Sequence, residues 1–347
     1  MEKQFLIVGQ GIAGSLLAYN MYKAGLNFTI ISSPHKSKAS DVAAGMFNPL
    51  VFKRLTKSWM VDEVLPVMME TYGDIENELG QKFLFPMDII KPLADHELKM
   101  WKERIEQGQF SDYIVEIGKN SVGKGIKGFD FYGRVTNSGY VHLEKMLNSL
   151  RDFFLKEGLL IESEFKYKDL GFIDGEITWH GISAETIVFC EGHHASENPY
   201  FKGIGFNPTK GELLEIECEG LAEDYILNKN LFVMPLGNHR FKVGATYDWK
   251  NLDVELTLEA RKDLLSRLEG LIELPYKVLN HWAGIRPTVI DRRPILGTHP
   301  LHKQVAILNG LGTKGVMLAP YFAREMVRVL SVNGYPLAKD VDIRRFL

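Results

Sequence analysis

The sequence feature that most constrains this chain is a glycine-rich turn near its N-terminus. An apolar run over residues 4–8 leads into a turn that contains Gly9, Gly11 and Gly14, and a helical pattern follows. A second apolar run, over residues 28–31, completes a βαβ unit. A strand, a Gly-x-Gly-x-x-Gly turn and a helix in this order are typical of a dinucleotide-binding site.

Each glycine of this turn has a physical role in such a site. Gly9 allows the tight turn, Gly11 lets the backbone approach a pyrophosphate, and Gly14 lets the helix pack close to the strand. Ile12 and Ala13 lie at the helix N-terminus, where free N–H groups and the helix dipole favour negative charge. A turn without a ligand is the alternative, but the flanking strand and helix favour the ligand.

The end of the second strand lacks the acidic residue that usually binds the ribose in these sites. Ser32 and Ser33 occupy this place, and His35, Lys36 and Lys38 follow. The cations could suit the extra phosphate of NADP, whereas a serine hydroxyl can hydrogen-bond an ordinary ribose as donor and acceptor. The first βαβ unit therefore predicts a dinucleotide and leaves its identity open.

The composition limits the size, partners and location of the protein. A chain of 347 residues predicts two domains, and a net charge of −3 gives no basic surface for nucleic acid. Cys190 and Cys218 form no Cys-x-x-Cys pair, so we predict no metal site and expect a reducing compartment. Neither a signal peptide nor an apolar run of membrane-spanning length is present, which predicts a cytoplasmic protein without a membrane span.

Three further segments could contact a ligand. Residues 42–49 are small and apolar, and they are predicted to be helical up to Pro49. Their small side chains could let backbone N–H groups reach a bulky ligand. Packing of the helix alone explains these residues equally well. The apolar run at 186–190 predicts a buried parallel strand, and it ends near two adjacent histidines, which we do not expect to face one site together. A second glycine-rich loop, at 310–315, precedes a helix.

Taken together, these segments resemble the FAD-dependent D-amino-acid oxidase family, which includes glycine oxidase, sarcosine oxidase and D-amino-acid dehydrogenase. The resemblance rests on five places spread over nearly the whole chain: residues 9–14, 39–45, 188–195, 283–297 and 310–320. The glycine turn alone is shared by many dinucleotide-binding proteins. The two C-terminal segments in this order are specific, and they favour FAD over NADP.

The resemblance implies an α/β fold, in which a Rossmann-like FAD-binding domain is interleaved with a substrate domain built on an antiparallel sheet. Residues 1–55, 140–208 and 283–347 would form the FAD-binding domain, and residues 56–139 and 209–282 the substrate domain. Residues 287–290 contain no cysteine that could tether the flavin, so we expect noncovalent FAD. The residues expected to contact it are Gly9, Gly11, Ile12, Ala13, Gly14, Ser32, Ser33, Ala43, Ala44, Gly45, Met46, Gly192, Gly284, Gly312, Thr313, Lys314 and Gly315.

The resemblance also implies the chemistry. A small amino acid or secondary amine would pass a hydride to the flavin, and the resulting imine would hydrolyse. Arg286 matches the family arginine that binds the substrate carboxylate; the alternative is that Arg286 only ties its loop down through a carboxylate such as Asp291. Tyr247 is a candidate for the pocket wall, with a packed tyrosine as the alternative. Lys314 would either face the flavin or be solvated.

Several functions stay open at this point. The electron acceptor could be oxygen or an electron carrier, which would make the protein an oxidase or a dehydrogenase. A reductase that uses NAD(P)H would normally need a second nucleotide fingerprint, and the loop at 310–315 does not form one. A flavin- or NADP-binding protein without catalytic activity is the remaining alternative. Arg292 and Arg293 add positive charge beyond Arg286 and suggest a doubly anionic substrate.

Overall fold

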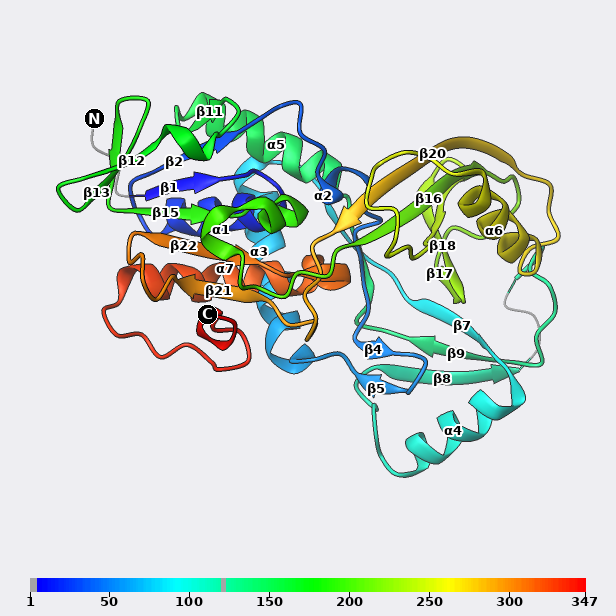
Figure 1. Ribbon diagram of the computed structural model, residues 1–347. Coiled ribbons are helices and arrows are strands. Elements are labelled where there is room, and N and C mark those ends of the chain that lie inside the picture. The colour runs from blue at the N-terminus through cyan, green and yellow to red at the C-terminus, as the bar shows by residue number, and fades with distance from the viewer. Residues whose placement is uncertain (1–4, 120–122) are drawn as a thin grey trace.

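The computed structural model describes residues 5–119 and 123–347, which form two lobes that meet along one side (Figure 1). One lobe is built on a six-stranded sheet and the other on an eight-stranded sheet. The chain passes between the lobes several times, so both sheets contain strands that lie far apart in the sequence. This arrangement confirms the predicted α/β fold with two interleaved parts.

The six-stranded sheet has the order β11-β2-β1-β15-β22-β21, and only the β21–β22 pair is antiparallel. Its strands are β1 (Phe5–Val8), β2 (Phe28–Ser32), β11 (Leu160–Glu162), β15 (Thr186–Phe189), β21 (Ile295–Thr298) and β22 (Val305–Asn309). The apolar runs after the N-terminus and at residues 186–190 form the parallel strands that the sequence predicts.

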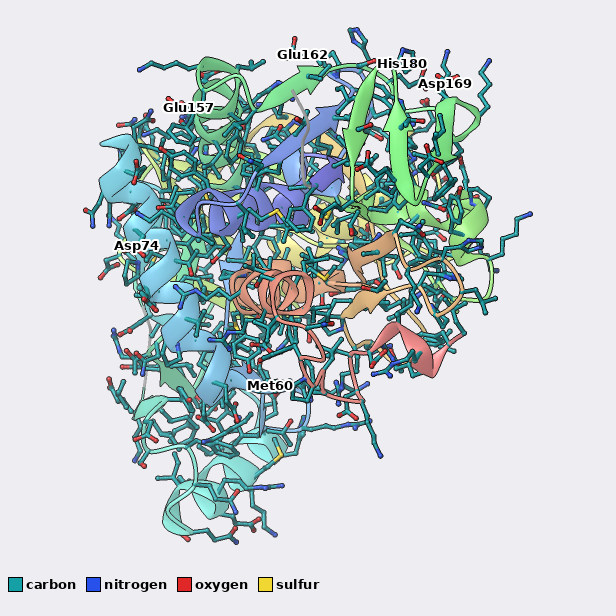
Figure 2. All side chains as sticks on the ribbon, turned by 90° about the vertical axis from the view of Figure 1, so that its left-hand side faces the viewer. Met60, Asp74, Glu157, Glu162, Asp169 and His180 are labelled. Atoms are coloured by element: carbon teal, nitrogen blue, oxygen red, sulfur yellow. The ribbon has the colours of Figure 1, made fainter. Side chains whose placement is uncertain are left out.

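Both faces of this sheet are covered. Phe5 and Ile7 of β1 pack on the helical side, and Leu6 and Val8 pack on the opposite side, because successive side chains of a strand alternate. The helical layer consists of α1 (Ile12–Lys23), α3 (Val61–Leu79), α5 (Leu143–Lys156) and α7 (Gly315–Ser331). The opposite layer includes a small sheet of β12 (Leu170–Ile173), β13 (Glu176–Trp179) and β14 (Ile182–Ala184), beside which His180 and Asp169 pair at 3.1 Å (Figure 2).

The eight-stranded sheet has the order β20-β16-β19-β18-β17-β7-β9-β8. Neighbouring strands are antiparallel except for β17 and β7, so the predicted antiparallel sheet is nearly regular. The helix α6 (Leu258–Glu269) covers one face, and α4 (Asp95–Glu106) packs beside β7 and β9. Its strands are β7 (Ile89–Leu93), β8 (Ile114–Lys119), β9 (Phe131–Val135), β16 (Thr209–Glu217), β17 (Ile226–Lys229), β18 (Leu231–Gly237), β19 (Arg240–Gly244) and β20 (Lys277–Arg286).

The domain limits predicted from the sequence stay a prediction, although one of them, at residue 283, falls inside β20.

Within the described ranges, no helix is both long enough and apolar enough to cross a membrane. The short elements are α2 (Ala39–Val42), β3 (Met46–Phe47), β4 (Leu50–Val51), β5 (Thr56–Lys57), β6 (Leu84–Pro86), β10 (Gly139–Val141) and the 3-10 helices η1 (Tyr167–Asp169), η2 (Gly192–Glu197), η3 (Pro199–Phe201), η4 (Gly312–Lys314) and η5 (Ile343–Arg345).

The helix predicted for residues 42–49 is wrong. Helix α2 ends at Val42, and the chain then turns at Gly45, whose φ is +76°. A side chain on Gly45 would overlap the carbonyl oxygen of Val141, so β3 can pair with β10 only because this residue is glycine. Strand pairing with a distant part of the chain therefore overrides the local helical pattern.

Gly14 fixes the distance between α1 and the end of β1. A Cβ atom at Gly14 would overlap the carbonyl oxygen of Gly9 and would lie 3.3 Å from the Cβ of Cys190. Both neighbours belong to the sheet edge at which β1 and β15 end, so neither can move without disturbing the parallel pairing. The close packing of helix and strand expected from the glycine turn is therefore present.

We predict that Gly14→Ala lowers the free energy of unfolding by about 1–3 kcal/mol, because the added methyl group has no space. Gly73 is the matched control: it lies within α3, and a Cβ there meets nothing within 4 Å. Gly73→Ala should stabilise the protein by about 0.5–1 kcal/mol. Chemical denaturation of both variants measures the effect, and equal stability of the two would contradict this account of α1 packing.

Candidate active site

A cavity of about 460 Å³ lies where the two lobes meet, and both large sheets contribute to its wall. This volume is typical of a small-molecule site. The structure brings most of the predicted site residues to this one wall: Gly9, Gly11, Ile12, Ala13, Ser32, Ser33, Ala43, Ala44, Gly45, Met46, Gly192, Tyr247, Gly284, Arg286, Gly312, Thr313 and Gly315. The two others, Gly14 and Lys314, do not line the cavity.

The N-terminus of α1 forms one end of the cavity. The first hydrogen bond of this helix runs from the Ser15 N–H to the Gly11 carbonyl at 2.9 Å, so the preceding N–H groups lie at an open helix end. One of them, the Ile12 N–H, donates to the Ser40 hydroxyl at 3.2 Å. The sequence reasoning did not select Ser40 individually, although it lies in one of the segments that carried the resemblance.

The wall beside β2 is polar and mostly cationic. Ser32 and Ser33 line it together with Lys36 and Lys38, as their positions after the strand predicted. Among the described lining residues the one carboxyl group is that of Glu191, which follows β15. It accepts hydrogen bonds at 2.8 Å each from the side chains of Tyr167 and Asn198. Burial raises the pKa of Glu191.

His193 and His194 both line the cavity, so the expectation that they cannot share one site is wrong. They lie in the 3-10 helix η2, where consecutive side chains do not alternate as they do in a strand, and their ring centroids are 3.9 Å apart. Burial, followed by the neighbouring His194, lowers the pKa of His193 to about 4. The imidazole of His193 is therefore neutral near pH 7.

The second glycine loop is connected to the turn after β15 by Asn309. The Asn309 amide donates to the Gly192 carbonyl at 2.9 Å and accepts from the Gly310 N–H at 2.8 Å. The Gly312 N–H donates to the Pro287 carbonyl at 3.2 Å, and the φ of Gly312 is +54°. These contacts fix the loop, of which Leu311, Gly312 and Thr313 line the cavity.

Arg286 lies at the end of β20 and reaches over Gly211 of β16, where a side chain on the glycine would overlap its guanidinium. The guanidinium donates to the carbonyl oxygens of Lys210 and Thr246 at 3.3 and 3.2 Å. It also stacks on the Tyr247 ring at 4.5 Å. The alternative of a tie to Asp291 is wrong, because Asp291 accepts a hydrogen bond from Arg345 at 2.8 Å. Tyr247 is 56% exposed, so it is not a packed core residue either.

Among the described residues, the guanidinium of Arg286 has no carboxylate partner. No carboxylate of the described ranges lies within 4 Å of it. Burial lowers the pKa of Arg286, yet an arginine remains protonated in proteins. Its positive charge thus faces a partly closed cavity with only carbonyl oxygens and an aromatic ring as partners. Such a site favours a ligand that brings a negative charge.

Other cations predicted near the site lie elsewhere. The Lys314 ammonium donates to the Ser58 hydroxyl and the residue is half-buried, so Lys314 is not a freely solvated lysine. Desolvation lowers its pKa to about 8. The guanidinium of Arg293 stacks on the Trp59 ring at 4.5 Å, and neither Arg292 nor Arg293 lines the cavity.

We predict that Lys314→Met raises the melting temperature at pH 7 by about 2 °C or more, because the wild-type protein buries a charge there. Below pH 8 this lysine is protonated in both the folded and the unfolded state. Above pH 8 the folded state loses the proton first, so wild-type stability gains from this group up to about pH 10.5. The variant should lack this gain, and identical pH profiles of the two proteins would exclude the assignment.

Comparisons with known proteins agree with this geometry. The family model described as FAD dependent oxidoreductase, DAO, matches residues 4–329. Glycine oxidase of Bacillus licheniformis is 26% identical, over 96% of this chain and 95% of that protein. The structure of glycine oxidase from Geobacillus kaustophilus superimposes with a TM-score of 0.80 at 19% identity and covers 98% of both chains. Iminodiacetate oxidase from Chelativorans sp. BNC1 gives 0.79 at 21% identity, over 99% of this chain and 98% of that chain.

The structural likenesses establish the fold, which the crossing of the chain between two sheets had already indicated. The family match goes further, because it includes both glycine loops and the strand that carries Arg286. It leaves out only the first three residues and the C-terminal segment after residue 329. The chain therefore belongs to the DAO family of FAD-dependent oxidoreductases.

Proposed function

We propose that the protein oxidises the C–N bond of a small amino acid or secondary amine, with noncovalently bound FAD as the oxidant. The observation that carries this proposal is the guanidinium of Arg286, which lacks a carboxylate partner among the described residues and lines the cavity beside the eight-stranded sheet. Relatives named glycine oxidase support a small substrate with both an amine and a carboxylate.

The cavity wall fits a flavin dinucleotide. Gly11 faces open space at the helix end, since a Cβ there would meet only the Ser40 hydroxyl at 3.6 Å. The pyrophosphate would be held at this helix end. The polar wall with Ser32 and Ser33 offers hydroxyl groups to a ribose, and the loop at Gly312 offers backbone to the ring system. When bound, FAD supplies the oxidising power, because it accepts a hydride from the carbon next to the substrate nitrogen.

The chain itself orients the substrate. Arg286 would bind the carboxylate in a bidentate manner, and its contacts with Lys210 and Thr246 hold the guanidinium in place. Tyr247 would close the mouth beside it. On this side of the wall the described titratable groups are Arg286 and Tyr247, so no side chain is a strong base. The substrate would therefore bind with its amine already neutral, because no side chain there would remove the proton. Water would hydrolyse the imine product.

We predict that Arg286→Ala raises the KM of carboxylate substrates about tenfold to a hundredfold, because a charge-assisted pair is lost. A carboxyl-free amine should change far less. Arg104→Ala, on α4 outside the cavity wall, is the control and should leave both values unchanged. Steady-state kinetics with both substrate types measures the effect. Equal losses on the two would remove Arg286 from carboxylate binding.

We predict that the purified protein is yellow and that denaturation releases all of its flavin into solution, since no covalent link is expected. Anaerobic titration with glycine, sarcosine, proline and D-amino acids should bleach the visible flavin band with at least one of them. Readmission of oxygen then separates an oxidase, which reoxidises rapidly and forms hydrogen peroxide, from a dehydrogenase that needs a carrier. A stable yellow protein that no amine bleaches would instead be a flavin-binding protein without turnover.

A further inference from the structure

We propose that the substrate carries a neutral hydrogen-bonding group, such as a carboxamide, remote from its carboxylate, and that Asn228 binds this group. The inference rests on the proposed amine oxidation and narrows it to a substrate class. It makes Asn228 a specificity-determining residue of the cavity, opposite Arg286 on the same sheet face.

The strand β17 directs Asn228 toward the cavity. Ile226, two residues earlier, packs in the large core cluster that includes α1 and α3, whereas Leu227 packs in the cluster beneath α6. Side chains alternate along a strand, so Asn228 shares the face of Ile226 and points away from α6. Its register partner on β18 is Phe232, which also lines the cavity.

The carboxamide of Asn228 is available to a ligand. It makes no hydrogen bond with any residue in the described ranges, although the residue is only half-exposed. Asn309, which also lines the cavity, uses its amide to join two turns. Asn230, the other asparagine on this wall, lies just past the end of β17 in an exposed turn with a φ of +60°. A carboxamide offers two donors and one acceptor, so a group that can both donate and accept would complement it.

The charges around this wall favour a neutral group over a second carboxylate. Lys229 points to the opposite face, where its ammonium lies 4.0 Å from the Phe129 ring centroid. Lys242 donates to the Ala43 carbonyl at 3.2 Å and does not line the cavity. With Arg292 and Arg293 also outside the wall, Arg286 is the one described cation on the substrate side. A second carboxylate would be buried there without a partner.

The surface between the two polar groups is apolar. One register row crosses the sheet from Asn228 through Phe232 and Gly244 to Leu213, and the guanidinium of Arg286 lies over the strand that carries Leu213. Three strand spacings separate the ends of this row, about 14 Å along the sheet. The arrangement matches a molecule whose carboxylate and polar neutral end are separated by an extended apolar middle.

The test compares substrates of similar shape on the FAD-loaded protein. α-Amino acids whose unbranched side chain ends in a carboxamide, from glutamine to its longer homologues, are each compared with the carboxylic acid and the alkyl analogue of the same length, and both enantiomers are measured. The wild-type protein should show a higher kcat/KM for the longer carboxamides than for the acid or alkyl analogue of the same length. Asn228→Leu and Asn228→Ala should each lower the carboxamide-to-alkyl ratio about tenfold to a hundredfold. Asn333→Leu, in an exposed turn outside the cavity wall, is the control and should keep the ratio.

Two results would overturn the inference while amine oxidation stands. One is a wild-type preference for the alkyl or carboxylic acid analogues over the longer carboxamides. The other is an equal loss on all substrates in both Asn228 variants, which would assign the residue to the shared amino-acid part. Flavin content and melting temperature are measured for both variants. They report folding independently of activity, so a folding defect can be told apart from a change in specificity. If no amino acid or amine bleaches the flavin of the wild-type protein, the proposed function fails, and this inference fails with it.

Discussion

The contact between Gly14 and Gly9 sets the geometry on which the site depends. It lets α1 begin directly above the end of β1, in a position that any side chain at residue 14 would prevent. The open N–H groups of the helix, the carboxyl ends of the parallel strands and the turn after β15 therefore meet at one edge of the sheet. In an open α/β sheet this edge is where ligands bind.

Electrostatics divides the cavity into two unlike parts. The nucleotide end combines helix amides and serine hydroxyls with Lys36 and Lys38, and its one described carboxyl group, Glu191, is held by Tyr167 and Asn198. The end beside the eight-stranded sheet, where we propose that the substrate binds, has Arg286 as its single described cation, the phenol of Tyr247, and otherwise apolar or amide groups. The first part suits a dianionic pyrophosphate, and the second suits one carboxylate.

The sequence predicted those parts of the site whose signal is local. The glycine turn, the strand that follows and the motif around Arg286 each lie within a few residues, so spacing alone reveals them. Glu191, Asn228 and the shared orientation of the two histidines were missed, because they depend on strand order and on a 3-10 turn. The helix expected at residues 42–49 failed for the same reason, since pairing with β10 decides the conformation there. The burial of Lys314 likewise depends on Ser58, which lies far away in the chain.

The strand β20 has a consequence for how the two ligands influence each other. It carries Arg286 at its end, and the carbonyl of the next residue, Pro287, accepts a hydrogen bond from the Gly312 N–H of the second glycine loop. A carboxylate bound by the arginine and a flavin placed against the loop, as we propose, would therefore act on the same short stretch of backbone. Thermodynamic reciprocity then requires that whatever factor the carboxylate applies to flavin affinity, the flavin applies equally to carboxylate affinity.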